Sequence, residues 1–495
     1  MSGKKITSFT LIIFLIIFGA ALLRFWRLES LTTFMGDQGY DFIIVKRMVA
    51  GEKFTMLGPK IGPYNQQGNL YLGPAYYYLL TPALLLSNLD PIGPAILTVI
   101  LAILTVAIIY IIGTEFFSKP IAALASAIYA FNPFLISQSR ASSNPHLIPF
   151  FSAAFIYATL KMTVGKSKKL VWQAVVGISL GIMFQLHYLA SALFIPTLIM
   201  LAYFKKFKEM LFIAFFFVLA ISPQIIFELR HKFFVTNLLF KQLTSGDNLV
   251  SISKFLMHLN KSLSSVSAIF VNFEKYQILN ILAISFFIYL FLKREAKLRI
   301  TVYFFSFIVI FGFIFASLYS GSIGPHYFTI IYVPVTILIS VAFFGIFNLT
   351  SSQLLKMLLA VVMIILFISN LTKLDLNHRN GYTMPVGWNQ EGVKKASKII
   401  AKDVDNSKKF NVAATLDGDT RAMPYRYLLE VYGKNPQKVE NYPDSDILYL
   451  ISRDVEETIK RYTVWEVSNF APFNIDQRWE IQNGIKLFKL THKNL

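Results

Sequence analysis

The sequence predicts a polytopic α-helical membrane protein that carries a small extracytoplasmic α/β domain at its C-terminus. Of the 495 residues, 55% are hydrophobic and only 15% are charged, whereas soluble domains carry about 25% charged residues. The hydrophobic residues come in long runs, so we expect most of them to be buried in lipid. The composition becomes mixed and polar after about residue 372. We therefore assign residues 1–372 to a membrane domain and residues 373–495 to the outer domain.

Eleven apolar segments qualify as membrane spans, because a spanning helix needs about 20 mostly apolar residues. The first, residues 6–23, follows Lys4 and Lys5 and lacks a convincing cleavage site, so it is interpreted as an uncleaved anchor. The remaining predicted spans are residues 93–113, 120–137, 147–163, 170–186, 189–204, 209–228, 276–292, 299–318, 326–348 and 354–372.

Basic residues fix the predicted orientation, because they concentrate in cytoplasmic loops. The predicted number of spans depends on the short, tyrosine-rich segment 73–86. If it does not span, three basic clusters share the side of Lys4 and Lys5, and these lie near residues 166–169, 205–208 and 293–299. We therefore place residues 73–86 as an interfacial or re-entrant helix outside the membrane, within a first outer loop of residues 28–92. The protein is predicted to lie in the plasma membrane, with a cytoplasmic N-terminus and an extracytoplasmic C-terminal domain.

Two outer features need a separate explanation. Arg24 and Arg27 end the first span on the outer side, against the charge rule, and we expect them either to extend to the interface or to attract an anionic headgroup. Residues 229–275 form another outer segment, in which Lys254, His258 and Lys261 alternate with apolar residues. This pattern indicates an interfacial helix.

The tail alternates helix-like and strand-like segments, as a small α/β domain does. Helices are predicted at residues 394–402 and 426–432, and strands at residues 410–416, 447–451, 462–467 and 485–490.

Several classes of site are excluded. The chain has no cysteine, which rules out disulfides, thiolate metal sites and a cysteine nucleophile. The net charge of +20 fits basic cytoplasmic loops and anionic lipid, and no nucleic-acid motif accompanies it. Neither a P-loop nor an H-E-x-x-H motif is present. Asp417-Gly418-Asp419 lacks the glutamate spacing of an EF-hand and is interpreted as a turn.

The first outer loop contains the strongest candidate for chemistry, Asp37, in the sequence Met-Gly-Asp-Gln-Gly-Tyr-Asp. Asp41 follows four residues later, so the two carboxylates would share one face of a helix. A carboxylate near lipid is partly desolvated, which raises its pKa and makes it a better base. The structural alternative is that Asp37 caps the helix, and the two interpretations are compatible. Lys60 and Tyr77, in the same loop, are further candidates for substrate binding.

Polar residues at other span ends fall on the same predicted face. Arg140 opens the second outer loop, and its forked guanidinium suits a phosphate. Ionisable groups at such boundaries are functional candidates, although each alone is more often an ordinary interfacial residue. The other candidates for substrate binding on this face are Asn144, His146, His187, Arg230, His326 and Tyr327.

The order of these motifs resembles the GT-C glycosyltransferases. The shared features are the first-loop acid Asp37, the Gly-Pro-x-Tyr-Tyr-Tyr segment, the Ser-Arg-x-x-x-Asn-Pro loop and His326-Tyr327. They look most like the bacterial protein mannosyltransferase and aminoarabinose transferase relatives, often called RgtA/B/C/D-like. The resemblance covers about residues 1–372 and does not extend to the tail.

The resemblance implies a hexosyl- or pentosyl-type glycosyltransferase that takes its sugar from a polyprenyl-phosphate donor. Asp37 would be the general base for the acceptor, which could be a glycan, a lipid or a protein. Relatives often have Asp-Glu at this position and a second acid in the next loop, where this chain has Gln38 and Asn144. These differences favour a metal-independent mechanism without a cofactor, in which Arg140 and the histidines bind the donor phosphate. Single displacement with inversion is expected.

Other functions remain possible from the sequence. A transporter or flippase for lipid-linked glycans would have inverted repeats, which the sequence does not show. A glycan polymerase or ligase would use the same lipid-linked chemistry. A non-enzymatic receptor is the last alternative, and only the polar tail, residues 373–495, would favour it.

Overall fold

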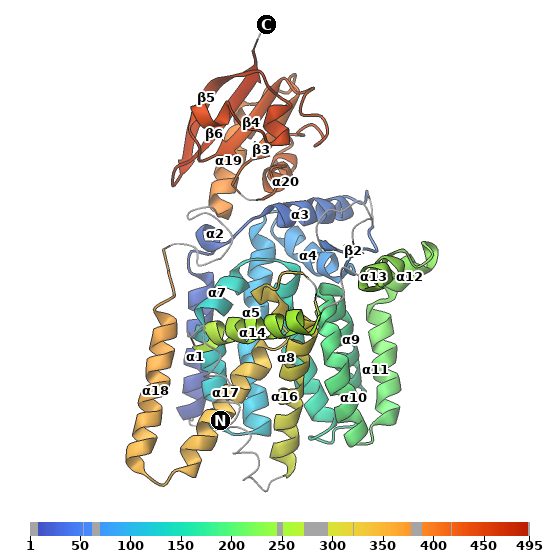
Figure 1. Cartoon of the computed structure of the whole chain (residues 1–495), viewed down its shortest axis with the longest axis vertical. Helices are drawn as coiled ribbons and strands as arrows, with labels where there is room; N and C mark the ends of the chain where they lie inside the picture. Colours follow the sequence, from blue (N-terminus) through green and yellow to red (C-terminus); the bar gives the residue numbers. More distant parts are fainter. Residues whose placement is uncertain are drawn as a thin grey trace, which may run out of the picture.

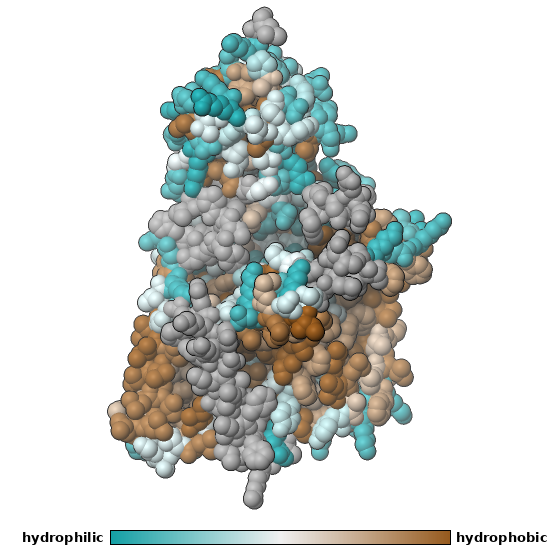
Figure 2. Space-filling model, viewed as in Figure 1, coloured by the Kyte–Doolittle hydropathy of each residue, from teal (hydrophilic) through white to brown (hydrophobic). Residues whose placement is uncertain are grey.

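The computed structural model describes residues 8–52, 54–61, 70–244, 251–271, 296–319, 321–377, 389–416 and 418–493. A helical bundle forms one end of the molecule and a sheet-containing domain forms the other (Figure 1). On the face shown in Figure 2, a hydrophobic band covers the bundle, and hydrophilic residues lie beyond it at both ends. This distribution is typical of a protein that spans a bilayer.

Within the described residues, five helices are long and apolar enough to span a membrane. They are α1 (Ser8–Phe25), α5 (Ile92–Phe116), α16 (Ala296–Ser317), α17 (Tyr332–Leu349) and α18 (Gln353–Leu371). Shorter apolar helices occupy other predicted spans: α8 (Ile148–Met162), α9 (Leu170–Leu186) and the pair η2 (Tyr188–Leu193) and α10 (Phe194–Tyr203). The predicted span at 276–292 lies outside the described residues. The structure therefore supports a multi-pass protein, and the number eleven stays a prediction.

Two predicted spans are bent rather than continuous. Residues 120–137 form α6 (Lys119–Phe131) and α7 (Pro133–Arg140), which meet at 58°. Pro133 lacks a backbone N–H and starts the second helix, while the Asn132 side chain caps it by accepting from Leu135 N at 3.0 Å. Residues 209–228 likewise divide into α11 (Phe207–Ala220) and α12 (Ser222–Arg230), at 64°. With each pair counted as one span, the described residues contain up to seven.

Arg24 does not extend to the interface as one alternative predicted, because its side chain is fully buried. Its guanidinium donates to Ala130 O at 2.7 Å and to Tyr129 O at 3.3 Å, which ties α1 to the end of α6. Backbone carbonyls near a helix end lack helical partners, so they can accept from a buried arginine. Arg27 remains exposed.

The end of the bundle next to the C-terminal domain, which we call the outer end after the predicted orientation, carries short elements between the spans (Figure 1). In the first outer loop these are α2 (Leu28–Leu31), α3 (Gly36–Val49), the hairpin β1 (Lys60–Ile61) and β2 (Leu70–Tyr71), and α4 (Ala75–Leu86). Later loops add η1 (Asn144–Leu147), α13 (Phe234–Thr244), α14 (Ile252–Val271) and η4 (Pro325–Phe328). Figure 1 shows α14 running across the bundle and α4 beneath α3. The interfacial position of α14 stays a prediction.

Residues 389–493, which we call the C-terminal domain, contain a four-stranded sheet of order β3-β4-β6-β5. The strands β3 (Phe410–Ala414) and β4 (Ile447–Ser452) are parallel, whereas β5 (Phe473–Gln482) and β6 (Ile485–His492) are antiparallel neighbours. The helices are α19 (Gln390–Asp403), α20 (Met423–Val431), α21 (Glu456–Ile459) and α22 (Trp465–Ser468). The predicted strand at 462–467 is wrong, since α22 lies there. Strand β5 was not predicted, because most of its residues are polar and partly or fully exposed.

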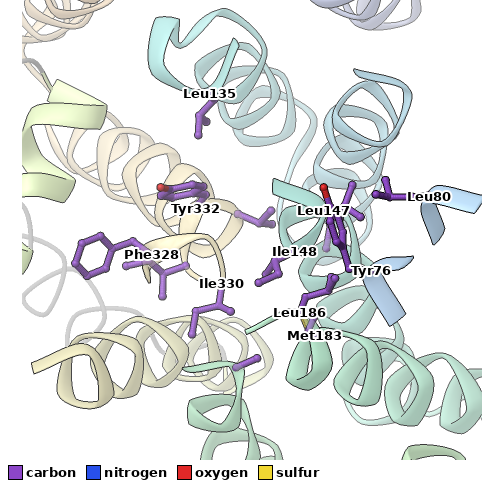
Figure 3. Packing of buried hydrophobic residues seen from close by; sticks show 14 of the residues in the cluster. Tyr76, Leu80, Leu135, Leu147, Ile148, Met183, Leu186, Phe328, Ile330 and Tyr332 are labelled. Carbon is purple, nitrogen blue, oxygen red and sulfur yellow. The ribbon is translucent and has the colours of Figure 1, made fainter. Parts of the chain in front are cut away.

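A hydrophobic core joins the elements that carry the outer loops. Figure 3 shows Tyr76 and Leu80 of α4 close to Leu147, Ile148 and Leu186. Phe328 and Ile330, which follow His326 and Tyr327, pack in the same cluster. These buried residues are neighbours, in the chain, of predicted site residues. Their packing therefore fixes the position of the backbone that carries the polar side chains.

Candidate functional site

Asp37 lies in the first turn of α3, at the outer end of the bundle. It is an exposed residue, and the capping alternative is wrong because the N-cap is Met35. The first turn is fixed by Gln38, whose Oε1 accepts from Met35 N at 2.7 Å. A carboxylate there is also favoured by the positive end of the helix dipole.

Gln38 stands where the resemblance to the GT-C glycosyltransferases leads us to expect an acid directly after Asp37, and the structure gives its amide a role. Its Nε2 donates to Ser142 O at 2.5 Å, so it links α3 to the second outer loop. A carboxylate could not donate this bond to a carbonyl. Among the described residues, no three His, Asp or Glu side chains come together to form a metal site.

Asp41 is buried one turn after Asp37 and accepts a hydrogen bond from Tyr77 OH at 2.7 Å. Burial raises the pKa of Asp41 to about 8, the Tyr77 hydrogen bond opposes the rise, and the nearby Asp37 charge adds to it. The hydroxyl oxygen of Tyr76, which precedes Tyr77 on α4, lies 3.2 Å from Ser142 Oγ. Two helices and the second outer loop therefore converge at this point.

The C-terminal domain approaches Asp37 closely. A Cβ added to Gly36 would lie 2.6 Å from both Cβ and Oδ2 of Asp419. The pKa of Asp37 is raised, first by the desolvation that the surrounding protein causes and then by the Asp419 charge, while Arg421 partly offsets both. Asp419 and Arg421 were absent from the predicted site. The turn they belong to was recognised, but no sequence signal places it beside a loop about 380 residues earlier.

Arg140 is buried at the end of α7 and donates through Nη2 to Leu23 O at 2.6 Å. Its own carbonyl accepts from Thr32 Oγ1 at 3.0 Å, so it also positions the segment that leads to Asp37. In this structure the guanidinium is bonded inside the protein and connects α7 with α1. A direct contact with a donor phosphate remains a hypothesis.

Asn144 and His146 shape the second outer loop. Asn144 Nδ2 donates to Leu186 O at 2.7 Å, which brings this loop to the end of α9. His146 Nδ1 lies 2.6 Å from Ala141 O and therefore donates to it. With the Gln38–Ser142 contact, the loop connects α3 to the region around His187.

A cluster of rings forms at that end of α9. The ring of His187 lies 5.1 Å from that of Tyr327 and 6.1 Å from that of His326, between centroids. Burial, with a smaller effect of His326, lowers the pKa of His187 to about 3, and burial also lowers the pKa of His326. Both imidazoles are therefore neutral near pH 7, so they can donate or accept hydrogen bonds but carry no positive charge.

The hairpin β1–β2 lies between these groups. Lys60 Nζ lies over the rings of Tyr40 and Tyr71, 5.6 and 5.9 Å from their centroids. Tyr40 precedes Asp41, and Tyr71 O accepts from Tyr188 OH at 2.5 Å, next to His187. The structure thus brings the α3 residues, Lys60 and the histidine cluster into one connected region. Arg230 stands exposed at the end of α12.

An apolar pocket lies between the spans α6, α17 and α18, with Asn132 and Asn370 as its polar lining residues. None of the predicted site residues lines it. It is suited to a hydrocarbon chain rather than to polar chemistry.

The chain is similar to known lipid-dependent glycosyltransferases. Residues 72–227 match the family model of dolichyl-phosphate-mannose-protein mannosyltransferase. The crystal structure of ArnT from Cupriavidus metallidurans bound to undecaprenyl phosphate matches with a TM-score of 0.61 and 11% identity, over 97% of both chains. The oligosaccharyltransferase AglB from Archaeoglobus fulgidus, in complex with an inhibitory peptide and a dolichol-phosphate, matches with a TM-score of 0.50 and 12% identity, over 89% of this chain and 69% of AglB. No curated protein sequence matches significantly.

The match to ArnT extends through the C-terminal domain, which the resemblance inferred from the sequence did not cover. At these identities the solved structures establish the fold, while the family model covers residues 72–227, from directly after β2 into α12. Together they agree with the resemblance predicted from the motifs: this chain shares the fold of ArnT, and its residues 72–227 match the protein mannosyltransferase model.

Proposed function

We propose that the protein is a membrane glycosyltransferase that moves a hexose or pentose from a polyprenyl-phosphate donor to an acceptor at the extracytoplasmic face. The observation that carries the proposal is the position of Asp37 within a GT-C fold. Asp37 is an exposed residue with a raised pKa in the first turn of α3, and α3 lies between the bundle and the C-terminal domain (Figure 1). A carboxylate with a raised pKa is a better base, and its position outside the membrane-spanning helices suits a donor whose phosphate lies at the membrane interface.

The proposed reaction is a single displacement. The acceptor O–H bond breaks and its proton passes to Asp37, while the acceptor oxygen forms a bond to the anomeric carbon. The bond from that carbon to the phosphate oxygen breaks, and its electron pair leaves with the polyprenyl phosphate. The configuration at the anomeric carbon is therefore inverted.

The departing phosphate needs hydrogen-bond donors or cations to stabilise its growing charge. We propose that Lys60 supplies the positive charge, since its ammonium lies beside Tyr40 on the helix that bears Asp37. The neutral His187 and His326 can donate single hydrogen bonds, and Tyr327 can add a third. Arg140 would act by holding α7 against α1 unless the donor displaces its bond to Leu23 O. No metal ion or cofactor takes part in this proposal.

The test compares Asp37→Asn with Glu52→Gln, which changes an exposed carboxylate beyond the other end of α3. Purified protein in nanodiscs would receive a panel of undecaprenyl-phosphate-linked hexoses and pentoses, and mass spectrometry would measure the released undecaprenyl phosphate. Loss of a general base should slow turnover about 10²- to 10⁴-fold, with donor binding retained. Equal turnover in both variants would contradict the role of Asp37, and no release from any donor by the wild type would contradict the function.

A further inference from the structure

The C-terminal domain meets α3 through the start of α20, in a contact that only glycine permits. A Cβ at Gly39 would overlap the backbone of Met423 and Pro424, and one at Gly36 would collide with Asp419. These glycines are three residues apart, so they lie on one face of α3. Absence of side chains there lets two backbones approach closely. Gly36 and Gly39 therefore form a surface of α3, next to Asp37, against which the C-terminal domain packs. We call this surface the seat of the domain.

Further contacts fix the domain on this seat. The ring of Tyr427 packs edge-on against Phe34 and Phe42, with centroids 6.0 and 5.6 Å away. Lys46 of α3 forms a 3.0 Å ion pair with Glu430 at the end of α20. At the far side, Lys394 pairs with Glu29 at 2.5 Å and Asp90 at 2.7 Å. The position of the domain relative to α3 is therefore set by apolar, ionic and backbone contacts together.

Residues 418–422, which we call the acceptor turn, contain Asp419 and Arg421, the two charged side chains that influence the pKa of Asp37. Arg421 donates to both carboxylate oxygens of Asp419, at 2.6 and 2.8 Å. Both side chains stay partly accessible, with 29% of Arg421 and 17% of Asp419 exposed. A guanidinium and a carboxylate are therefore held side by side at the rim of the site, where a ligand can reach them.

The turn is held from behind by a buried arginine. Arg426 Nε donates to Arg421 O at 2.7 Å, and its other nitrogens bond Gln437 O at 2.7 Å and Tyr442 OH at 2.8 Å. Ala422 adopts a left-handed conformation with φ of +56°, which disfavours any residue with a Cβ. Such strain persists only where surrounding contacts enforce it, and it is frequent at functional sites.

The location of the turn indicates which substrate it faces. The C-terminal domain lies beyond α3 as seen from the hydrophobic band (Figures 1 and 2). A donor with a polyprenyl tail must come from the band, whereas a water-accessible acceptor must come from the other side of Asp37. The acceptor turn therefore borders the acceptor half of the site.

We propose that Asp419 and Arg421 bind the acceptor, and that this acceptor is a carbohydrate with neighbouring hydroxyl groups. The proposal rests on the function proposed above. Each sugar hydroxyl both donates and accepts a hydrogen bond, so a pair of vicinal hydroxyls matches an adjacent carboxylate and guanidinium. A serine or threonine peptide offers one hydroxyl at the reacting position and lacks this match. The C-terminal domain would then contribute acceptor-binding residues to the site.

The test uses Arg421→Gln, Asp419→Asn and, as a matched control, Arg478→Gln, which changes an exposed arginine of β5. The full-length protein in nanodiscs would be given the undecaprenyl-phosphate sugar that the wild type uses best. Acceptor probes would be a panel of methyl glycosides and a serine/threonine hexapeptide. Two rates are measured for each variant: transfer to each acceptor, and hydrolysis of the donor by water when no acceptor is present.

We expect both turn variants to raise the KM for methyl glycosides about tenfold or more, since each removes a charge-assisted hydrogen bond. Donor hydrolysis needs no acceptor and should change by a smaller factor than the KM for glycosides, although both side chains also influence the pKa of Asp37. Arg421→Lys should recover part of the loss because it keeps the charge. Unchanged KM for the glycosides in both variants overturns the inference, as does transfer only to the hexapeptide. The proposed function fails separately, if the wild type neither transfers nor hydrolyses the sugar or if Asp37→Asn does so at the wild-type rate.

Discussion

Replacing Asp41 with asparagine should stabilise the folded protein in a strongly pH-dependent way. The carboxyl is buried, with 7% of the residue exposed, and its pKa is about 8 instead of 3.8. The folded protein therefore keeps the proton over a pH range in which the unfolded chain has released it. Asparagine resembles the neutral acid and can still accept the hydrogen bond from Tyr77.

The size of the effect follows from the two pKa values. Below pH 3.8 both states bind the proton, so Asp41 imposes no penalty. Between 3.8 and about 8, each pH unit lowers the free energy of unfolding by about 1.4 kcal/mol, because the unfolded state binds fewer protons. The penalty is about 2 kcal/mol at pH 5 and reaches about 6 kcal/mol at pH 9, where it no longer grows.

Thermal unfolding of the detergent-solubilised protein at pH 5 and pH 9 measures this difference. The gain in Tm from Asp41→Asn should be larger at pH 9 by about 4 °C. Asp444→Asn, in an exposed turn of the C-terminal domain, provides the control and should show no such dependence. An Asp41→Asn effect of equal size at both pH values would refute the reasoning, since it would mean that the buried carboxyl does not titrate differently on folding.

Three other predictions follow from named contacts. Gly39→Ala should weaken the seat of the C-terminal domain and destabilise the protein by about 1–3 kcal/mol, whereas Gly418→Ala meets open space; limited proteolysis and Tm would show whether the two differ. Arg24→Met should lower Tm by removing the bonds to Ala130 O and Tyr129 O, and the same change at the exposed Arg27 should not; equal losses would contradict the tie between α1 and α6. Because the chain has no cysteine, single cysteines at Lys168 and Lys434 can be labelled selectively; we expect Lys168→Cys to react only from the cytoplasm and Lys434→Cys only from outside, and labelling of both from one side would overturn the proposed orientation.

The helical part of the fold was largely predictable because hydropathy acts locally. A run of apolar residues identifies a buried helix wherever its partners lie. The bends at Asn132-Pro133 and at Ile221 were missed because the apolar run continues through them, although the prolines Pro133 and Pro223 were visible signals. Strand β5 was missed because an exposed edge strand carries mostly polar residues and so lacks the hydrophobic pattern.

The site was predictable only where its residues are close in sequence. Asp37 and Asp41 could be placed on one helix from their spacing, and α3 contains both. The partners of that helix come from far along the chain: Tyr77 from α4, Ser142 from the second outer loop and Asp419 from the C-terminal domain. Periodicity carries no information on such pairings. Arg24 and Arg140 show the converse, since their charge indicated surface or ligand contacts, whereas their donors bond backbone carbonyls inside the protein.

The last helix before the C-terminal domain, α18, has no buried residue, although it is 19 residues long. Its side chains are at most partly buried, and the domain is positioned by contacts with α2, α3 and residues 89–90 after α4 rather than by the helix that precedes it in the chain. A change of length after α18 should thus leave the outer domain where it is. Recombination at this junction would exchange one outer domain for another while the lipid-facing helices kept their geometry. For the transferase proposed above, this offers a simple route to new products on an unchanged membrane scaffold.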